Sequence, residues 1–430
     1  MGFTKFQIKK TGSTLILLIL VFLSGCSIYQ TKANAIDVTD RLSGYTGRKL
    51  TLLVYMAADN DLESYALENI KAMERAVFRN INVLALLDRS DGYDETDGNW
   101  TDTRLFEVLH DNTDGSFMVS RRLDCPELGL SAQNSTELDM SNYHVLQNFI
   151  SYAKKNYKAQ NYALIIWGHG TGWRFSQESA RAVALDDKSG SYMTITQMGK
   201  ALKDQGLSVI GFDTCFAGVF ECIYQINCSA QYTVASPGIT PSAGWNYKQL
   251  LEKLDSDSFD SLTIAKYMAQ SSLVNATVFD NSQVENVFAD LEDFSKSLSQ
   301  TIVDEQSRAV AFEQLMNLKA YSYTQYPCDK YLDIYSLADF YSLSAEQELS
   351  EKAENMKCSI GKLCPDSHGV GLHFIPMVSA GMAATCHSKD YVKDFERTDQ
   401  CAFVQKSLWW VPSKDTASDS LLNKLFYKTY

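Results

Sequence analysis

The sequence lacks an excess of basic residues, and this absence limits the partners that the protein can have. Its 430 residues carry a formal net charge of -13, and removing residues 1–25, which hold three lysines and no acid, moves the charge to -16. A protein without a basic stripe cannot follow a phosphate backbone, so nucleic-acid binding is not expected. The negative field instead favours cationic partners.

Other absences exclude further classes of protein. No two CxxC motifs lie close together, which argues against a structural zinc site, and no internal repeat indicates a solenoid. A hydrophobic content of 45% with 21% charged residues makes disorder an unlikely default. The apolar run from Ser13 to Leu23 is too short to span a bilayer comfortably. The chain is therefore expected to be globular, with one large domain or two ordinary ones.

The first 25 residues have the layout of a secretory signal, with three lysines followed by the apolar run. The run ends in Leu23, Ser24, Gly25 and Cys26, which resembles the lipobox of bacterial lipoproteins, where the cysteine is lipidated. The alternative is an ordinary signal peptide with an incidental cysteine. We expect a bacterial lipoprotein anchored through Cys26 and facing outside the cytoplasm, with residues 26–48 as a polar tether.

Beyond the tether, apolar runs alternate with segments of helical periodicity. This alternation predicts an α/β fold whose mostly parallel central sheet is flanked by helices. The predicted strands are 51–57, 81–87, 162–167, 207–212 and 231–236, and the helices between them include 62–77, 196–205 and 220–226. Downstream, residues 258–300 and 304–320 are predicted to be helical. Residues 369–375 form a strand that rejoins the sheet or belongs to a smaller subdomain, and a terminal amphipathic helix near 421–426 docks on the core.

Cysteines and acidic residues offer weaker signals. Apart from Cys26 and Cys215, eight cysteines remain, an even number that permits up to four disulfides in an exported chain. It is equally expected that most are small buried hydrophobic residues. The acids between Asp88 and Thr103 do not have EF-hand spacing, so a solvated hairpin turning at Asp97 and Gly98 is preferred to a calcium loop. We assign no metal ligand.

The most informative residues are His169 and Cys215, because each follows a predicted buried strand. The carboxyl ends of parallel strands meet at one edge of a sheet, and the 46 positions between the two residues leave room for one crossover. An imidazole and a thiol at one edge can act as base and nucleophile. We expect Cys215 to enter a helix whose positive end favours the thiolate. The N–H groups of Gly170 and Cys215 would face the developing oxyanion.

Seven motifs together resemble the clostripain-like cysteine peptidases, which are related to caspases, legumains and gingipains. The resemblance spans about 49–376 and rests on LVYMAADNDLE (53–63), YALIIWGHGTGW (162–173), FDTC (212–215), VAS (234–236), GWNY (244–247), YLDIYSLADF (331–340) and GVGLHFIP (369–376). It implies a caspase-like α/β sandwich, His169 and Cys215 as the catalytic pair, and cleavage after a basic residue. We expect a peptidase domain at 49–380 and a helical extension at 381–430.

The resemblance also directs attention to Asp213 and Arg181. Asp213 lies two residues before Cys215, so its carboxylate is expected to bind a substrate Arg or Lys; the alternative is a cap for the following helix. Family members often cut themselves between the catalytic His and Cys, and Arg181 matches the usual position best. Two prolines in the loop 236–247, Pro237 and Pro241, depart from the family pattern and put the substrate preference in doubt.

These observations predict a lipid-anchored, exported cysteine endopeptidase that cleaves protein or peptide substrates after Arg or Lys. No cofactor is required for this chemistry, and calcium, which activates some relatives, stays open through the acidic loops. The alternative is a non-catalytic surface-binding lipoprotein that keeps the peptidase fold. An amidase or another cysteine hydrolase is a third alternative, disfavoured because it would not need Asp213.

Overall fold

The computed structural model describes residues 48–113, 115–173, 183–256, 260–274, 276–323, 326–366 and 369–374, with 403, 406–409, 421 and 425. The predictions for the signal sequence, the tether, Cys26 and Arg181 fall outside the described residues. No described helix has both the length and the apolar content that a membrane span requires.

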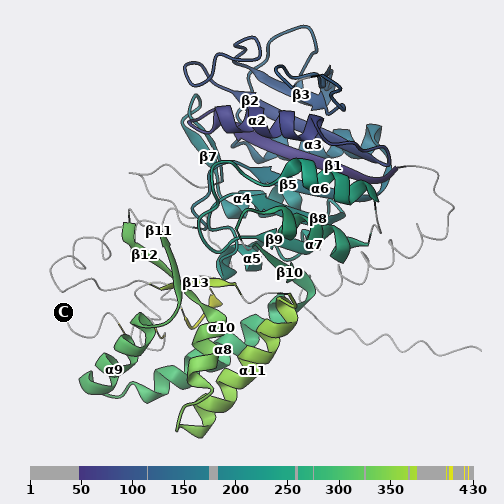
Figure 1. Ribbon diagram of the computed structural model, residues 1–430. Coiled ribbons are helices and arrows are strands. Elements are labelled where there is room, and N and C mark those ends of the chain that lie inside the picture. Colours follow the sequence, from purple (N-terminus) through teal and green to yellow (C-terminus); the bar gives the residue numbers. More distant parts are fainter. Residues whose placement is uncertain are drawn as a thin grey trace, which may run out of the picture.

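An eight-stranded sheet forms the centre of the molecule (Figure 1). Its strands follow the order β10-β9-β8-β5-β1-β2-β3-β4, and the five from β9 to β2 run parallel. The outer strands β10, β3 and β4 are antiparallel to their neighbours. The bounds are β1 (Arg48–Ala58), β2 (Ile81–Arg89), β3 (Thr103–Glu107), β4 (Arg121–Leu123), β5 (Ala159–Trp167), β8 (Leu207–Asp213), β9 (Ala230–Ala235) and β10 (Thr277–Asp280).

Helices cover both faces of this sheet because its inner strands are apolar on both sides. In β1, Leu52 and Val54 belong to one buried cluster while Leu53 and Tyr55 belong to the other, as expected when successive side chains point to opposite faces. The first cluster includes residues of α2 (Glu63–Glu74), α6 (Tyr247–Ser256) and α7 (Ser261–Ser271). The second includes residues of α3 (Tyr143–Asn156), α4 (Ile195–Leu202) and α5 (Phe220–Ile226).

The rest of the described chain adds a group of helices beyond the β10 edge and two small sheets (Figure 1). A three-stranded sheet of order β11-β12-β13 lies beside the helices, and β6 pairs with β7 as a hairpin. The bounds are β6 (Val183–Asp186), β7 (Ser191–Met193), α8 (Val284–Thr301), α9 (Glu305–Met316), β11 (Ala320–Tyr323), β12 (Tyr326–Asp333), α10 (Ile334–Tyr341), α11 (Gln347–Leu363) and β13 (Gly371–Phe374), with single turns η1 (Pro126–Leu128) and η2 (Asn281–Gln283).

The predicted α/β class and mostly parallel sheet are confirmed, and one local prediction needs correction. The segment 258–300 is not helical throughout, because the short strand β10 adds to the sheet edge between α7 and α8. The strand near 369–375 belongs to the smaller sheet, which confirms the second of the two alternatives. Leu421 and Leu425 are fully buried in the core, as predicted for a docked terminal segment.

Candidate active site

The sheet register brings the ends of β5 and β8 together. Trp167 and Asp213 are the last paired residues of these neighbouring parallel strands. His169 and Cys215 each lie two positions beyond that pair. The amide of Gly168 donates to the Asp213 carbonyl at 3.4 Å, which extends the contact past the strand ends. The register therefore places both residues just beyond the carboxyl ends of neighbouring strands, at one edge of the sheet.

The sulfur of Cys215 lies against a loop rather than a helix. The Thr240 backbone N–H points at Sγ, with 3.3 Å between nitrogen and sulfur, and the Thr240 hydroxyl donates to the Thr214 carbonyl at 2.9 Å. The Phe216 amide donates to the Gly238 carbonyl at 2.9 Å, so residues 238–240 run alongside the turn that holds the thiol. The Cys215 thiol can also donate to the Thr240 carbonyl, with 3.6 Å between sulfur and oxygen, so Thr240 contacts the sulfur through both of its backbone polar groups.

The expectation that Cys215 enters a helix is wrong. Residues 215–218 form a turn, and α5 begins only at Phe220. Phe216 has a left-handed backbone with φ of 56° although it carries a bulky side chain, a conformation that costs roughly 1–3 kcal/mol. This turn changes the direction of the chain after β8 and leaves Cys215 half-exposed. The Thr240 backbone, rather than the start of a helix, contacts the sulfur.

His169 is held by a residue that sequence reasoning missed. Its Nε2 lies 2.5 Å from Oδ1 of Asp61, and the His169 side chain is only 15% exposed. Asp61 follows β1, the neighbour of β5 on the side away from β8. An Asp-rich segment such as 59–61 is typical of a turn and helix cap, but α2 begins after Leu62 without a side-chain cap. The sequence did contain a signal for this contact, because Asp61 also follows a parallel strand and so lies at the same sheet edge as His169.

Gly170 packs directly on the backbone of the thiol turn. A Cβ at this position would come within 2.9 Å of the Thr214 side chain and would overlap the Cys215 carbonyl oxygen. Only glycine therefore permits this approach. The contact brings the main chain of Gly170 beside that of Cys215, which is the proximity that a shared oxyanion site requires.

Asp213 is buried, at 4% exposure, beneath the same edge. Its Oδ2 accepts hydrogen bonds from the Trp245 amide at 2.9 Å and the Tyr247 hydroxyl at 2.8 Å. Burial raises the pKa of the Asp213 carboxyl to about 7, and the two hydrogen bonds only partly oppose it. Its Oδ1 is buried and has no hydrogen-bond partner among the described residues. The alternative that Asp213 caps the next helix is wrong, because α5 has Val219 as its N-cap.

The three-stranded sheet contacts both loops of this site. The Tyr331 hydroxyl donates to the Thr171 carbonyl at 3.2 Å, and the ring of Tyr331 packs on that of Phe216 with 5.4 Å between centroids. The Gly371 amide donates to the Gly218 carbonyl at 3.2 Å. Residues of the motifs that begin at 331 and 369 therefore contact and support the loops that carry His169 and Cys215.

Most of the cysteines in the described part of the chain are not in disulfides. Cys228 is disulfide-bonded. Cys125, Cys222, Cys358 and Cys364 are free thiols, and all of these except Cys358 are buried. Among the described residues, Cys125, Cys222 and Cys364 are buried, which agrees with the buried-hydrophobe alternative for these three.

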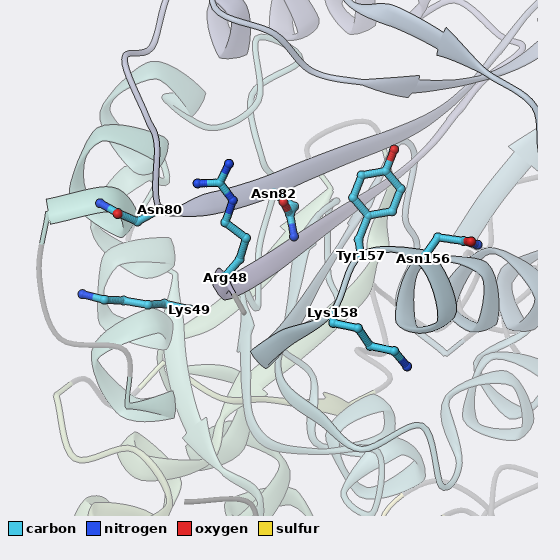
Figure 2. A pocket seen from close by; sticks show the side chains of 7 residues that line it. All are labelled: Arg48, Lys49, Asn80, Asn82, Asn156, Tyr157 and Lys158. Carbon is cyan, nitrogen blue, oxygen red and sulfur yellow. The ribbon is translucent and has the colours of Figure 1, made fainter. Parts of the chain in front are cut away.

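A surface cavity of about 610 Å³ lies at the opposite end of the sheet from Cys215. Figure 2 shows its lining at the amino ends of β1, β2 and β5, where the cationic side chains extend in different directions. It is formed by Arg48, Lys49, Asn80, Asn82, Asn156, Tyr157 and Lys158. None of the predicted site residues lines it, so this cavity is separate from the candidate active site.

Comparison with known proteins gives concordant results. A model of the clostripain family matches residues 54–410. The curated relative clostripain from Hathewaya histolytica is 28% identical over 281 residues, which cover 58% of this chain and 52% of the relative, so the match spans about half of that relative's length.

Two solved structures share the fold. An inactive zymogen C11 protease from Parabacteroides distasonis has a TM-score of 0.55 and 17% identity, covering 79% of this chain and 96% of that one. A secreted C11 cysteine protease from Bacteroides thetaiotaomicron, in complex with an irreversible peptide inhibitor, has a TM-score of 0.54 and 18% identity, covering 82% and 99%. At these identities the likeness supports the α/β sandwich alone.

Proposed function

Because the chain belongs to the clostripain family of C11 cysteine peptidases, we propose that it is a cysteine endopeptidase that cleaves peptide bonds after Arg or Lys. The observation that carries the proposal is the shared register of β5 and β8, which sets His169 and Cys215 two positions beyond one residue pair. The test is Cys215-dependent turnover of fluorogenic peptides with Arg or Lys, but not Asp, at the scissile position.

The proposed reaction uses groups whose positions are known. Asp61 holds Nε2 of His169, so Nδ1 is the nitrogen available to take the Cys215 proton. The thiolate, stabilised by the Thr240 amide, attacks the substrate carbonyl carbon. The carbonyl oxygen becomes an oxyanion that accepts hydrogen bonds from the N–H groups of Gly170 and Cys215. His169 returns the proton to the leaving amine, which leaves a thioester on sulfur. Water then attacks the thioester, giving its proton to His169 and releasing the acid and the thiol.

The substrate's basic side chain is proposed to bind Asp213. The unpaired Oδ1 of this buried carboxyl supplies the acceptor, while the Trp245 amide and the Tyr247 hydroxyl fix Oδ2. A guanidinium or ammonium group bound there pairs with the carboxylate away from water, where charge-assisted hydrogen bonds are strong. This arrangement also accounts for the GWNY motif, two of whose residues orient Asp213.

We expect Asp61→Ala to lower kcat about tenfold with little change in KM, because the variant loses orientation of the imidazole and no substrate contact. Steady-state kinetics on an Arg peptide measures this. Asp61→Asn keeps an oxygen that can accept from Nε2–H and should recover most of kcat. Equal kcat in Asp61→Ala and wild type would show that the contact between Asp61 and His169 has no role in turnover.

Activation by self-cleavage is proposed at Arg181, in the interval between the two catalytic residues. Incubated wild-type protein should split into two fragments, the second beginning at Ala182, as read by terminal sequencing. Both Cys215→Ala and Arg181→Gln should stay intact at that bond. An intact wild-type chain with full peptidase activity would contradict the proposal.

Export with a lipid anchor at Cys26 is proposed from the signal-like first 25 residues and the lipobox-like sequence that precedes this cysteine. Cells fed a labelled fatty acid should incorporate it into the wild type and not into Cys26→Ser, and the variant should move from the membrane fraction to the soluble one. Cys358→Ser, which removes an exposed free thiol elsewhere, is the matched control. Equal labelling of Cys26→Ser and wild type would exclude this anchor.

A further inference from the structure

The cavity at the amino ends of β1, β2 and β5 is lined by cations and amides and by no carboxylate. Arg48, Lys49 and Lys158 supply the charge, while three asparagine side chains and Tyr157 supply neutral hydrogen-bonding groups. All three basic residues are exposed. This composition runs against the rest of the chain, whose formal net charge is -13. The cavity therefore attracts anions on a protein that otherwise repels them.

Two carboxylates that contact the lining already bind other groups. Asp255 accepts from two successive backbone amides at 2.9 and 2.5 Å and also binds the Asn80 side chain. Glu107 forms an ion pair with Arg121 and accepts from the Tyr157 hydroxyl at 3.3 Å. These acids therefore hold the walls of the cavity and do not neutralise its cations.

The charges of Arg48 and Lys158 are left open to a partner. Within the described ranges, no carboxylate forms an ion pair with either side chain. The charge of Lys158 also reaches the half-buried Lys154, whose pKa is lowered first by burial and then by this neighbour. A bound anion would relieve this repulsion between like charges.

The chain enters the sheet at the same face from its proposed anchor. Arg48 is the first residue of β1 and pairs with Ala159 of β5, so the start of the sheet lies at the cavity. Cys26 lies 22 positions earlier, a stretch that spans at most about 70–80 Å when fully extended. A lipidated Cys26 would therefore keep this face within reach of the bilayer.

The directions of the three cations favour an extended partner over a small one. Figure 2 shows the side chains of Arg48, Lys49 and Lys158 pointing away from one another. A single small anion is best held by groups that converge on it. Diverging cations instead suit a surface on which negative charges are spread out, as the headgroups of anionic phospholipids are.

We propose that Arg48, Lys49 and Lys158, which we call the basic face, dock the folded domain on an anionic phospholipid membrane. This inference rests on the proposed lipid anchor at Cys26, which brings the basic face to that membrane. Each basic residue near an anionic bilayer strengthens binding about fivefold, so the three together would contribute about 100-fold.

Docking of the basic face determines where the candidate active site points. The nine residues of β5 run from this face towards His169, a length of roughly 30 Å. Cys215 follows the neighbouring strand β8 at the same far edge. The site would therefore face away from the bilayer and take its substrates from the surrounding medium.

The test uses the full lipidated chain in vesicles, with Cys215→Ala to prevent self-cleavage and Cys358→Ser to remove an exposed thiol. A fluorescent donor is attached through Gln160→Cys, beside the basic face, or through Asp91→Cys, beyond the carboxyl end of β2; both positions are exposed. The vesicles carry an energy acceptor on their headgroups. They contain phosphatidylcholine alone or with about 30% phosphatidylglycerol, which makes the surface anionic.

In the anionic vesicles, energy transfer from the Gln160 label should exceed transfer from the Asp91 label at least about twofold, and about 0.5 M salt should abolish the difference. Arg48→Gln, Lys49→Gln and Lys158→Gln together should abolish it as well. This triple variant should still float completely with neutral vesicles, because its anchor is intact. Should it fail to fold in a thermal unfolding check, the salt and lipid dependence of the parent decides.

The matched control combines Lys296→Gln, Lys352→Gln and Lys357→Gln on α8 and α11, which lower the net charge equally and should keep the difference. Equal transfer from the two labels in anionic vesicles, or a difference that survives in the basic-face variant, overturns the inference. Inorganic phosphate that binds the parent without such a difference would assign the cavity to a soluble anion instead.

Flotation separates failure of the anchor from failure of docking. A parent that does not float with neutral vesicles would defeat the lipid anchor alone. Docking then predicts flotation with anionic vesicles that is sensitive to salt and is lost in the basic-face variant. A parent that floats with neither kind of vesicle overturns both proposals.

Discussion

Cys215→Ala is expected to abolish cleavage of Arg and Lys peptides, with a loss of at least about 10⁴-fold in kcat, because the nucleophile and the thioester both disappear. Fluorogenic peptides with Arg, Lys or Asp at the scissile position measure it, after wild type and variant have had equal time to self-cleave. His169→Ala should fall to a similar level, since residues that act as a unit do not contribute additively.

The matched control is Cys222→Ala, a buried free thiol of α5 that lies outside the site. It should keep wild-type kcat once thermal unfolding shows that it is folded. Iodoacetamide should modify Cys215 and inactivate the wild type while Cys222 stays unmodified, because Cys215 is half-exposed and Cys222 is not. Turnover that survives in Cys215→Ala would place the nucleophile elsewhere, and no turnover in any form would support the surface-binding alternative.

Asp213→Ala is expected to lower kcat/KM on Arg peptides by about 10³-fold, because the substrate cation would be buried without its partner. Iodoacetamide should still alkylate Cys215 at nearly the wild-type rate, since the thiol turn keeps its contacts with Thr240. Asp213→Asn tests charge alone, because its oxygen still accepts from Trp245 and Tyr247. An unchanged preference for Arg in both variants would exclude Asp213 as the specificity residue.

The raised pKa of Asp213 also predicts the acid limb of the pH profile. Only the ionised carboxylate pairs with Arg, so kcat/KM should fall about tenfold per pH unit below about 7, where the buried group becomes protonated in the free enzyme. Its hydrogen-bonding neighbours, Trp245 and Tyr247, carry no charge there, because the pKa of Tyr247 is raised well above its usual range. For a peptide with a neutral residue at the scissile position, kcat/KM should not show this fall caused by protonation of Asp213.

The raised pKa of Asp213 also determines how the stability of the folded protein changes with pH. The folded-state pKa of Asp213 lies above the unfolded value, so its stabilising contribution is complete below about pH 4 and is lost as the pH rises through about 7. Asp213→Asn removes this loss and should unfold at a higher temperature than wild type at pH 8. The difference between their Tm values should shrink as the pH falls below 7 and disappear at about pH 4. A wild type that is the more stable of the two at pH 8 would contradict the assignment.

The sequence was sufficient to predict the centre of the fold because its strands are continuous apolar runs. The runs at 51–57, 162–167 and 207–212 lie within β1, β5 and β8, where both faces are buried and the hydrophobic pattern leaves no alternative. The strand β10 escaped prediction because four residues at an edge, flanked by α7 and α8, carry too short a pattern to stand out from helical surroundings.

The placement of His169 and Cys215 after neighbouring strands was predictable from the sequence, while their immediate contacts were not. Thr240 lies 25 positions after Cys215 and Asp61 lies 108 positions before His169, so no local pattern joins them. The supposed helix at Cys215 shows the limit of local reasoning: Phe216 adopts a left-handed backbone that its own preferences oppose. Tertiary hydrogen bonds to Gly238 and Ser236 determine that turn.

The pairing of β5 with β8 has a consequence for the order of events as the protein forms. Parallel pairing of segments distant in sequence is among the slower steps of folding, because the connecting loop must lose entropy before contacts compensate for it. The emerging chain presents His169 first, and the thiol of Cys215 joins it only when β8 adds to β5. The proposed nucleophile and base therefore stay apart in every unfolded or half-synthesised chain, and hydrolytic capacity arises only with late maturation of the sheet.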